Sequence, residues 1–78
     1  MKTKYDWSSV PSEVKWVSTD WEGWKLEHTE KPIKNEGTMM FESEESDGYC
    51  GCLYCYAPDK NEYKGDWEDS LEERPNEN

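Results

Sequence analysis

The chain has 78 residues and a mass of 9.3 kDa, and its 19 acidic residues against 9 basic residues give a formal net charge of −10. A chain this short buries only about 60–65% of the surface that it exposes when unfolded, so we expect no large enzyme core with a deep pocket. Low hydrophobicity and high charge are typical of disordered chains, but five Trp, five Tyr and one Phe predict a folded domain.

The negative charge argues against two classes of partner. Proteins that bind nucleic acid gain affinity by neutralising phosphates with Lys and Arg, and the anionic inner face of a membrane repels an acidic protein. The sequence contains no apolar run long enough to span a membrane, and residues 1–6 lack the apolar region of a signal peptide. We therefore expect a soluble, cytoplasmic protein that binds neither nucleic acid nor membrane directly.

The charge is uneven along the chain. Residues 1–41 hold seven acidic and six basic residues, whereas residues 42–78 hold twelve acidic and three basic residues. We expect a single small domain over residues 1–78, with an N-terminal segment (residues 1–11), an antiparallel sheet core (residues 12–56) and an acidic C-terminal segment (residues 57–78).

Two segments in which apolar and polar residues alternate predict a β-hairpin. The first covers residues 13–18 and the second covers residues 24–28. The five residues between them end at Gly23, which can adopt the positive φ that such a loop needs. One face of the hairpin is then expected to carry the apolar residues Val14, Trp16, Trp24 and Leu26.

Two further strands are expected after the hairpin. A turn at residues 35–37 precedes a strand candidate at residues 38–42. The next candidate, residues 49–56, ends in a turn at residues 57–61 that contains Pro58.

The C-terminal segment predicts a short helix. Residues 66–74 can form about two helical turns, with Asp66 as N-cap and with Trp67 and Leu71 on one face. The fold class that follows is mainly β: a small antiparallel sheet of three to five short strands with a short C-terminal helix or turn.

Three cysteines within six positions, Cys50, Cys52 and Cys55, form the sharpest chemical pattern in the sequence. With His28 as a fourth ligand they would suit zinc, which favours thiolate and imidazole ligands in a tetrahedral arrangement. A bound zinc would also stabilise a domain with so small a core. Two alternatives remain open: the thiols are small buried apolar groups, or two of the three form a disulfide.

Motifs of known enzyme classes are absent from the sequence. His28 is the single histidine and would be the base of any cysteine nucleophile, and there is no glycine-rich phosphate loop, Gly-x-Ser-x-Gly or His-Glu-x-x-His pattern. Carboxylates are so frequent in residues 42–73 that spacing selects no acid–base pair. The sequence therefore favours a protein without enzymatic activity and, apart from zinc, without a cofactor.

Acidic residues gather in two clusters, at residues 42–47 and residues 66–73. Blocks of like charge usually form a solvated surface. Alternatively, a rigid array of carboxylates imitates the phosphates of a nucleic-acid strand and docks into a groove lined with Lys and Arg.

Five tryptophans exceed what the core of so small a sheet can bury. Trp21 at the predicted hairpin tip, and also Trp7, are therefore expected to be partly exposed, as tryptophans at interfaces often are. In the alternative, Trp16, Trp24 and Trp67 form the core and Trp21 caps it. The residues that we expect to contact a partner are Trp21, Glu44, Glu45, Asp47, Glu68 and Asp69.

Short motifs at both ends of the chain carry a resemblance to a known group. They are Asp6-Trp7-Ser8 with Pro11, Trp16 with residues 20–23, Lys31-Pro32, and residues 66–75. In these motifs the chain resembles small, acidic, Trp-rich early proteins of tailed bacteriophages, whereas residues 49–56 have no counterpart. The resemblance implies expression in a bacterial cytoplasm and a role in binding host proteins.

The function predicted from these observations is non-enzymatic. The protein is expected to bind and inhibit a host protein with a basic surface, such as a nucleic-acid enzyme or a defence system, by imitating DNA. The alternative is a zinc-stabilised structural or adaptor module that uses the cluster of Cys50, Cys52 and Cys55 with His28.

Overall fold

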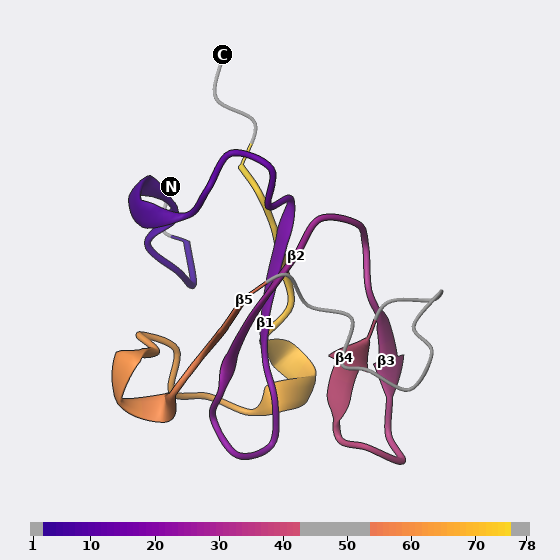
Figure 1. The fold of residues 1–78 in the computed structure, drawn as a ribbon. Helices are drawn as coiled ribbons and strands as arrows, with labels where there is room; N and C mark the ends of the chain where they lie inside the picture. Colours follow the sequence, from indigo (N-terminus) through magenta and orange to yellow (C-terminus); the bar gives the residue numbers. More distant parts are fainter. Residues whose placement is uncertain (1–2, 43–53, 76–78) are drawn as a thin grey trace.

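The computed structural model describes residues 3–42 and 54–75 of the chain. Within these residues the fold is mainly β, with six short strands in two antiparallel sheets and three single-turn 3-10 helices, which confirms the predicted class (Figure 1). The elements are η1 (Trp7–Ser9), β1 (Trp16–Thr19), β2 (Lys25–His28), β3 (Ile33–Asn35), β4 (Met40–Glu42), β5 (Tyr54–Tyr56), η2 (Pro58–Lys60), η3 (Trp67–Asp69) and β6 (Glu72–Glu73).

The predicted hairpin is confirmed as β1 and β2, which pair antiparallel from Trp16 opposite His28 to Thr19 opposite Lys25. Gly23 in the connecting loop has a φ of 96°, as the sequence suggested. The first strand begins later than predicted, because the backbone N–H of Val14 donates to the carbonyl of Pro11 at 3.0 Å and closes a turn. That hydrogen bond removes Val14 from the strand.

The larger sheet has the strand order β5-β2-β1-β6. Its outer strand β6 was not predicted, since residues 66–74 suggested about two helical turns. Only Trp67–Asp69 forms a helical turn, and the side chain of Asp66 makes no capping hydrogen bond. The chain then straightens, and Glu72 and Glu73 pair with Val17 and Trp16 of β1.

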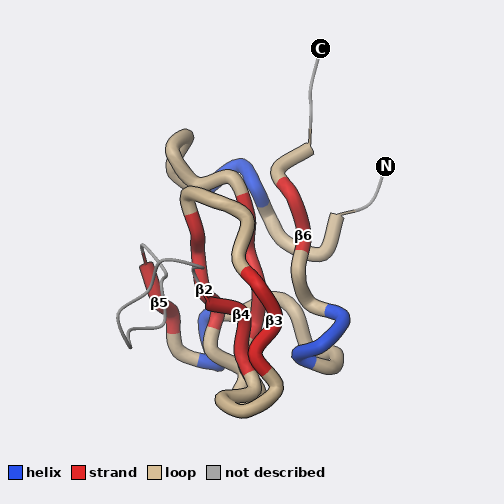
Figure 2. Tube along the Cα trace, turned by 90° about the vertical axis from the view of Figure 1, so that its right-hand side faces the viewer, coloured by secondary structure: helices blue, strands red, loops and turns tan. Residues whose placement is uncertain are grey.

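The smaller sheet is the β3–β4 hairpin, in which Ile33 pairs with Glu42 and Asn35 with Met40. The predicted turn at residues 35–37 and strand at residues 38–42 are confirmed in part, because Asn35 belongs to β3 and β4 begins only at Met40. The strand β3 was missed because it is three residues long and follows Pro32. The turn is closed by the side chain of Asn35, whose Oδ1 accepts from the N–H of Gly37 at 2.9 Å. Figure 2 shows this hairpin in front of β1 and β2, on one side of the larger sheet.

The last predicted strand, residues 49–56, is described only in part. Tyr54–Tyr56 forms β5, which pairs with β2 and places Cys55 opposite Leu26, and the rest of the prediction lies outside the described residues. The expected turn follows β5 as η2.

The core lies on one side of the larger sheet, against the N-terminal segment. Its buried cluster joins Val17 of β1 to residues that precede the strand, and the partly buried Tyr63 packs against it. The predicted apolar face is wrong in part: Val14 packs with Val17, Trp16 and Leu26 lie on the opposite face, and Trp24 is 39% exposed. The buried cluster consists of Tyr5, Trp7, Val10, Val14 and Val17.

Among the described residues, no helix is long and apolar enough to cross a membrane.

Candidate functional site

The β1–β2 loop is held in a fixed shape by its own first residue. Asp20 is buried, and its Oδ1 accepts hydrogen bonds from the N–H groups of Glu22 at 3.0 Å and Trp24 at 2.8 Å. The N–H of Gly23 donates to the carbonyl of Asp20 at 3.0 Å. An Asp that bonds the backbone two and four residues ahead stabilises a tight turn, and here it leaves Trp21 projecting from the loop.

A buried asparagine ties this loop to the C-terminal half of the chain. The Nδ2 of Asn61 donates to the carbonyl of Gly23 and to the Oγ1 of Thr19, both at 2.9 Å. Its Oδ1 accepts from the N–H of Tyr63 at 3.1 Å. Because one side chain serves both segments, the loop and residues 61–63 form one rigid unit.

A second buried side chain fixes η3 beside the same loop. The Oγ of Ser70 accepts from the N–H of Thr19 at 2.8 Å and lies 2.6 Å from the carbonyl oxygen of Trp67. Trp67 itself packs edge-on against Phe41 of β4, with ring centroids 5.7 Å apart. The three segments that meet here therefore come from distant parts of the sequence.

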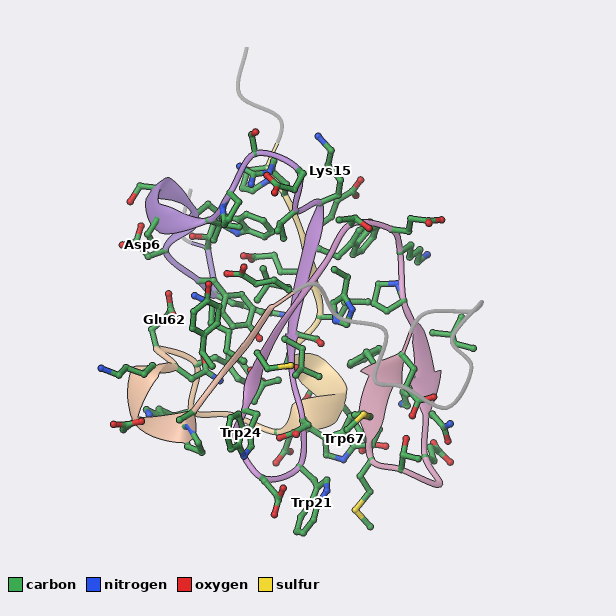
Figure 3. All side chains as sticks on the ribbon, viewed as in Figure 1. Asp6, Lys15, Trp21, Trp24, Glu62 and Trp67 are labelled. Atoms are coloured by element: carbon green, nitrogen blue, oxygen red, sulfur yellow. The ribbon has the colours of Figure 1, made fainter. Side chains whose placement is uncertain are left out.

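Exposed apolar side chains gather at this end of the molecule. Trp21 is 57% exposed and Met39 is 47% exposed, and the N–H of Trp21 donates to the carbonyl of Met39 at 3.1 Å. Figure 3 shows Trp21, Trp24 and Trp67 together at this end. We call this surface the tryptophan end and define it as Trp21, Glu22, Trp24, Met39 and Asp66.

A groove of about 290 Å³ opens at the tryptophan end, between the β1–β2 loop and residues 63–67. Its aromatic lining comes from Trp21, Tyr63 and Trp67, and its acidic lining includes Glu22 and Asp66. Apolar faces and negative charge therefore line the same small groove.

The groove has a net negative formal charge, because Asp20, Glu22 and Asp66 outnumber Lys64 in its lining. Desolvation raises the pKa of Tyr63, and the carboxylates of Asp69 and Asp66 raise it further. Lys64 also lines the groove, and its Nζ donates to the carbonyl of Pro58 at 3.1 Å. The carboxylate of Asp66 has no ion-pair partner among the described residues, so its charge remains uncompensated at short range.

Several carboxylates outside the groove form hydrogen bonds or ion pairs that stabilise the fold. Glu72 accepts from the indole Nε1 of Trp7 at 2.7 Å and from the N–H of Lys4 at 3.0 Å. Glu62 pairs with the buried Lys25 at 3.2 Å and accepts from the N–H of Asp6 at 2.7 Å. Because these carboxylates are engaged in contacts within the molecule, the negative charge on its surface is less uniform than the composition suggests.

Two of the glutamates have pKa values shifted in opposite directions. Burial raises the pKa of Glu27, which is 2% exposed, although Lys25 and a hydrogen bond from Tyr56 act against this. At Glu62 burial also raises the pKa, but the backbone hydrogen bonds and Lys25 outweigh it and the pKa is lowered.

The residues predicted to contact a partner fall in different places. Trp21 is exposed at the hairpin tip as expected, whereas the expected exposure of Trp7 is wrong because Trp7 is buried in the core. Glu68 and Asp69 are exposed on η3, and Glu68 pairs with Lys34 of β3 at 3.5 Å. Three predicted residues, Glu44, Glu45 and Asp47, lie outside the described residues.

The predicted zinc ligands are only partly described. His28 is 1% exposed, and its Nε2 lies 2.8 Å from the Oγ of Ser18. Cys55 is exposed in β5 on the same face of the sheet as His28, because it lies opposite Leu26, two residues before His28. Cys50 and Cys52 lie outside the described residues, and the described residues contain no group of three or more side chains able to hold a metal. The zinc hypothesis stays a prediction.

Sequence reasoning missed most of the lining of the groove. Glu22 and Tyr63 carry no motif, and Asp66 was expected only as an N-cap and as part of an acidic cluster; Asn61 and Ser70 bring these residues together from positions far apart in the sequence. A usable signal was present only in the loop, where Asp20 three residues before Gly23 is typical of a side-chain-closed turn.

Comparison of the chain with protein-family models, with curated proteins and with solved structures gives no match.

Proposed function

We propose that the protein binds a host protein with a basic surface, of the kind presented by nucleic-acid enzymes, and blocks that surface in place of DNA. No chemical step is part of this proposal. The resemblance to small phage early proteins suggests that the partner is bacterial. The tryptophan end is the observation that carries the proposal.

Exposed tryptophan beside exposed carboxylate is the composition expected of a docking surface for a basic protein. Trp21 and Trp24 offer a large contact area with few torsions to immobilise. Glu22 and Asp66 add negative charge at the rim, which speeds encounter with a positive partner and makes it sensitive to salt.

The ion pairs of the molecule support the same proposal. Within the described residues only Glu36, Glu62 and Glu68 pair with a lysine. The guanidinium of Arg74 donates instead to backbone carbonyls, with its Nε 2.7 Å from the carbonyl oxygen of Val14. Exposed carboxylates such as Asp69 are therefore left for an external partner.

The test is capture of partners from bacterial lysate on immobilised protein, at low and at high salt, with and without added duplex DNA. We expect a bound nucleic-acid enzyme that duplex DNA displaces and that high salt releases, because both ligands would occupy one basic site. A partner that stays bound in high salt and in excess DNA contradicts the proposal.

A pair of variants separates a specific surface from net charge. Glu22→Gln with Asp66→Asn removes two charges from the tryptophan end, and Glu13→Gln with Glu30→Gln removes two exposed charges beyond Trp16 and His28, at the opposite end of the hairpin. We expect the first pair to weaken capture and the second to leave it unchanged. Equal weakening by both pairs would show that only overall charge matters.

A further inference from the structure

The carboxylate of Asp66 lacks the hydrogen bond that is usual at its position. Asp66 occupies the N-cap position of η3, where an Asp side chain normally accepts a hydrogen bond from the first turn, yet it makes none. It is exposed and has no ion-pair partner among the described residues. Asp66 also lines the groove, and its carboxylate is therefore available to an external cation.

Trp21 provides the second half of a cation site. Trp21 lines the same groove and is 57% exposed. In the described part of the chain, cations lie over the rings of Tyr5, Tyr56, Trp16 and Trp7, but none lies over Trp21.

The molecule contains an internal example of an arginine stacked on a tryptophan. The guanidinium carbon of Arg74 lies 4.9 Å from the centre of the Trp7 ring, and Glu72 accepts a hydrogen bond from the indole of Trp7. The guanidinium of Arg74 donates to the backbone carbonyls of Val14 and Pro11, so this example shows the stacking and not an ion pair with the carboxylate. At the tryptophan end, the tryptophan and the carboxylate are present without the arginine.

The size and charge of the groove select the ligand. A volume of about 290 Å³ lies at the lower limit of the roughly 300–1,000 Å³ typical of ligand pockets and is large enough for one planar side chain. Planar guanidinium stacks on an aromatic ring and pairs with carboxylate at the same time, whereas the ammonium of lysine is a strongly hydrated point charge.

We propose that this groove binds an arginine side chain of the partner protein, with the guanidinium stacked on Trp21 and paired with the carboxylate of Asp66. This inference rests on the proposed function, and it names the group on the partner that the tryptophan end recognises. An arginine that would otherwise contact a DNA phosphate is a ligand of this class.

The experiment is an NMR titration of the full chain with blocked tripeptides Gly-Arg-Gly, Gly-Lys-Gly and Gly-citrulline-Gly. The arginine peptide is expected to shift the indole N–H of Trp21 and the amide of Gly65 saturably, with a Kd on the order of 1 mM. The lysine peptide should bind more weakly, and the uncharged citrulline peptide should cause no saturable shift. Equal shifts with arginine and citrulline, or arginine shifts only outside the groove, overturn the inference.

Matched variants locate the site. Asp66→Asn and Trp21→Ala are each expected to weaken arginine binding about three- to tenfold. The controls are Glu30→Gln, which removes the same charge at the opposite end, and Trp24→Ala, which removes an exposed indole outside the groove. Both controls should bind as the wild type does, and a control that loses as much affinity as its counterpart contradicts the assignment.

The titration is independent of any partner protein. Absence of arginine binding together with salt-sensitive capture from lysate overturns the groove assignment and leaves the proposed function intact. Arginine binding in the groove without capture of any partner supports the groove and contradicts the proposed function.

Discussion

The hydroxyl of Ser70 contacts both backbone polar groups of Thr19, in the way that a neighbouring strand would. Oγ of Ser70 accepts from the N–H of Thr19 at 2.8 Å and lies 3.0 Å from its carbonyl oxygen, and both residues are buried. One side chain thereby extends the contact between β1 and the segment of β6 two residues beyond the last strand pair, Val17 with Glu72, and fixes the position of η3.

Replacement of Ser70 by Ala should therefore destabilise the fold. The N–H of Thr19 would be buried without an acceptor, and the expected loss is about 1–3 kcal/mol of unfolding free energy, measured by urea denaturation. Ser9→Ala is the matched control, because the exposed Ser9 hydroxyl makes only a 3.3 Å hydrogen bond to the carbonyl of Asp6. A Ser70→Ala variant as stable as Ser9→Ala would contradict this account.

Gly23 should tolerate no ordinary side chain. Its φ is 96°, and a Cβ atom there would lie 3.3 Å from the Cβ of Pro58. We expect Gly23→Ala to cost about 1–2 kcal/mol in thermal or chemical unfolding. Asn places a Cβ at the same point but adopts positive φ more readily than Ala, so Gly23→Asn should cost less stability than Gly23→Ala. If both substitutions cost the same, contact with Pro58 and not backbone conformation is the cause.

Glu27 and Glu62 should affect stability with opposite pH dependence. The pKa of Glu27 is raised above 4.5, so its favourable contribution is complete below the unfolded pKa and is lost as pH rises through the folded pKa. The stability of Glu27→Gln relative to wild type should therefore increase from acid to neutral pH.

The pKa of Glu62 is lowered below 4.5, so its contribution is present at neutral pH and is lost as pH falls through the folded pKa. Glu62→Gln should be less stable than wild type at neutral pH, and the difference should vanish in acid. Urea denaturation over a pH series measures both effects. Parallel pH profiles for the two variants would refute the assigned environments.

Chelation tests the zinc alternative. The apolar core is built from side chains such as Tyr5 and Val17, and the Nε2 of His28 is engaged by Ser18. We therefore expect EDTA to leave the unfolding midpoint unchanged. One zinc per chain in native mass spectrometry, together with unfolding on chelation, would establish the alternative instead.

The hairpin was predictable because its signals are local. The alternation of apolar and polar residues in 24–28 and the glycine at position 23 can both be recognised within a short stretch of sequence. The structure pairs β1 with β2 as these signals predict. The strand β6 was not predictable, because Glu72-Glu73 carries no strand pattern and pairs only since β1 offers an open edge.

Which aromatic residues are buried was the least predictable property. Lys25 and Glu27 are buried in β2 while Trp21 and Trp24 are exposed, which reverses the order expected from hydrophobicity. The reversal has a physical basis: Lys25 is satisfied by Glu62 and by the rings of Tyr5 and Tyr56, partners that no pattern in the sequence identifies. The tryptophan end was therefore foreseen at Trp21 alone.

The path of the chain also constrains when the protein can complete its folding during synthesis. Arg74 donates to the carbonyls of Pro11 and Val14, and the outer edge of β1 is closed by Glu72 and Glu73. Contacts between the first and last parts of a sequence form slowly, because a long loop must close before they are made. A nascent chain that still lacks residues 72–74 leaves the outer edge of β1 and the carbonyls of Pro11 and Val14 without these partners, so folding is completed only after translation has passed Arg74.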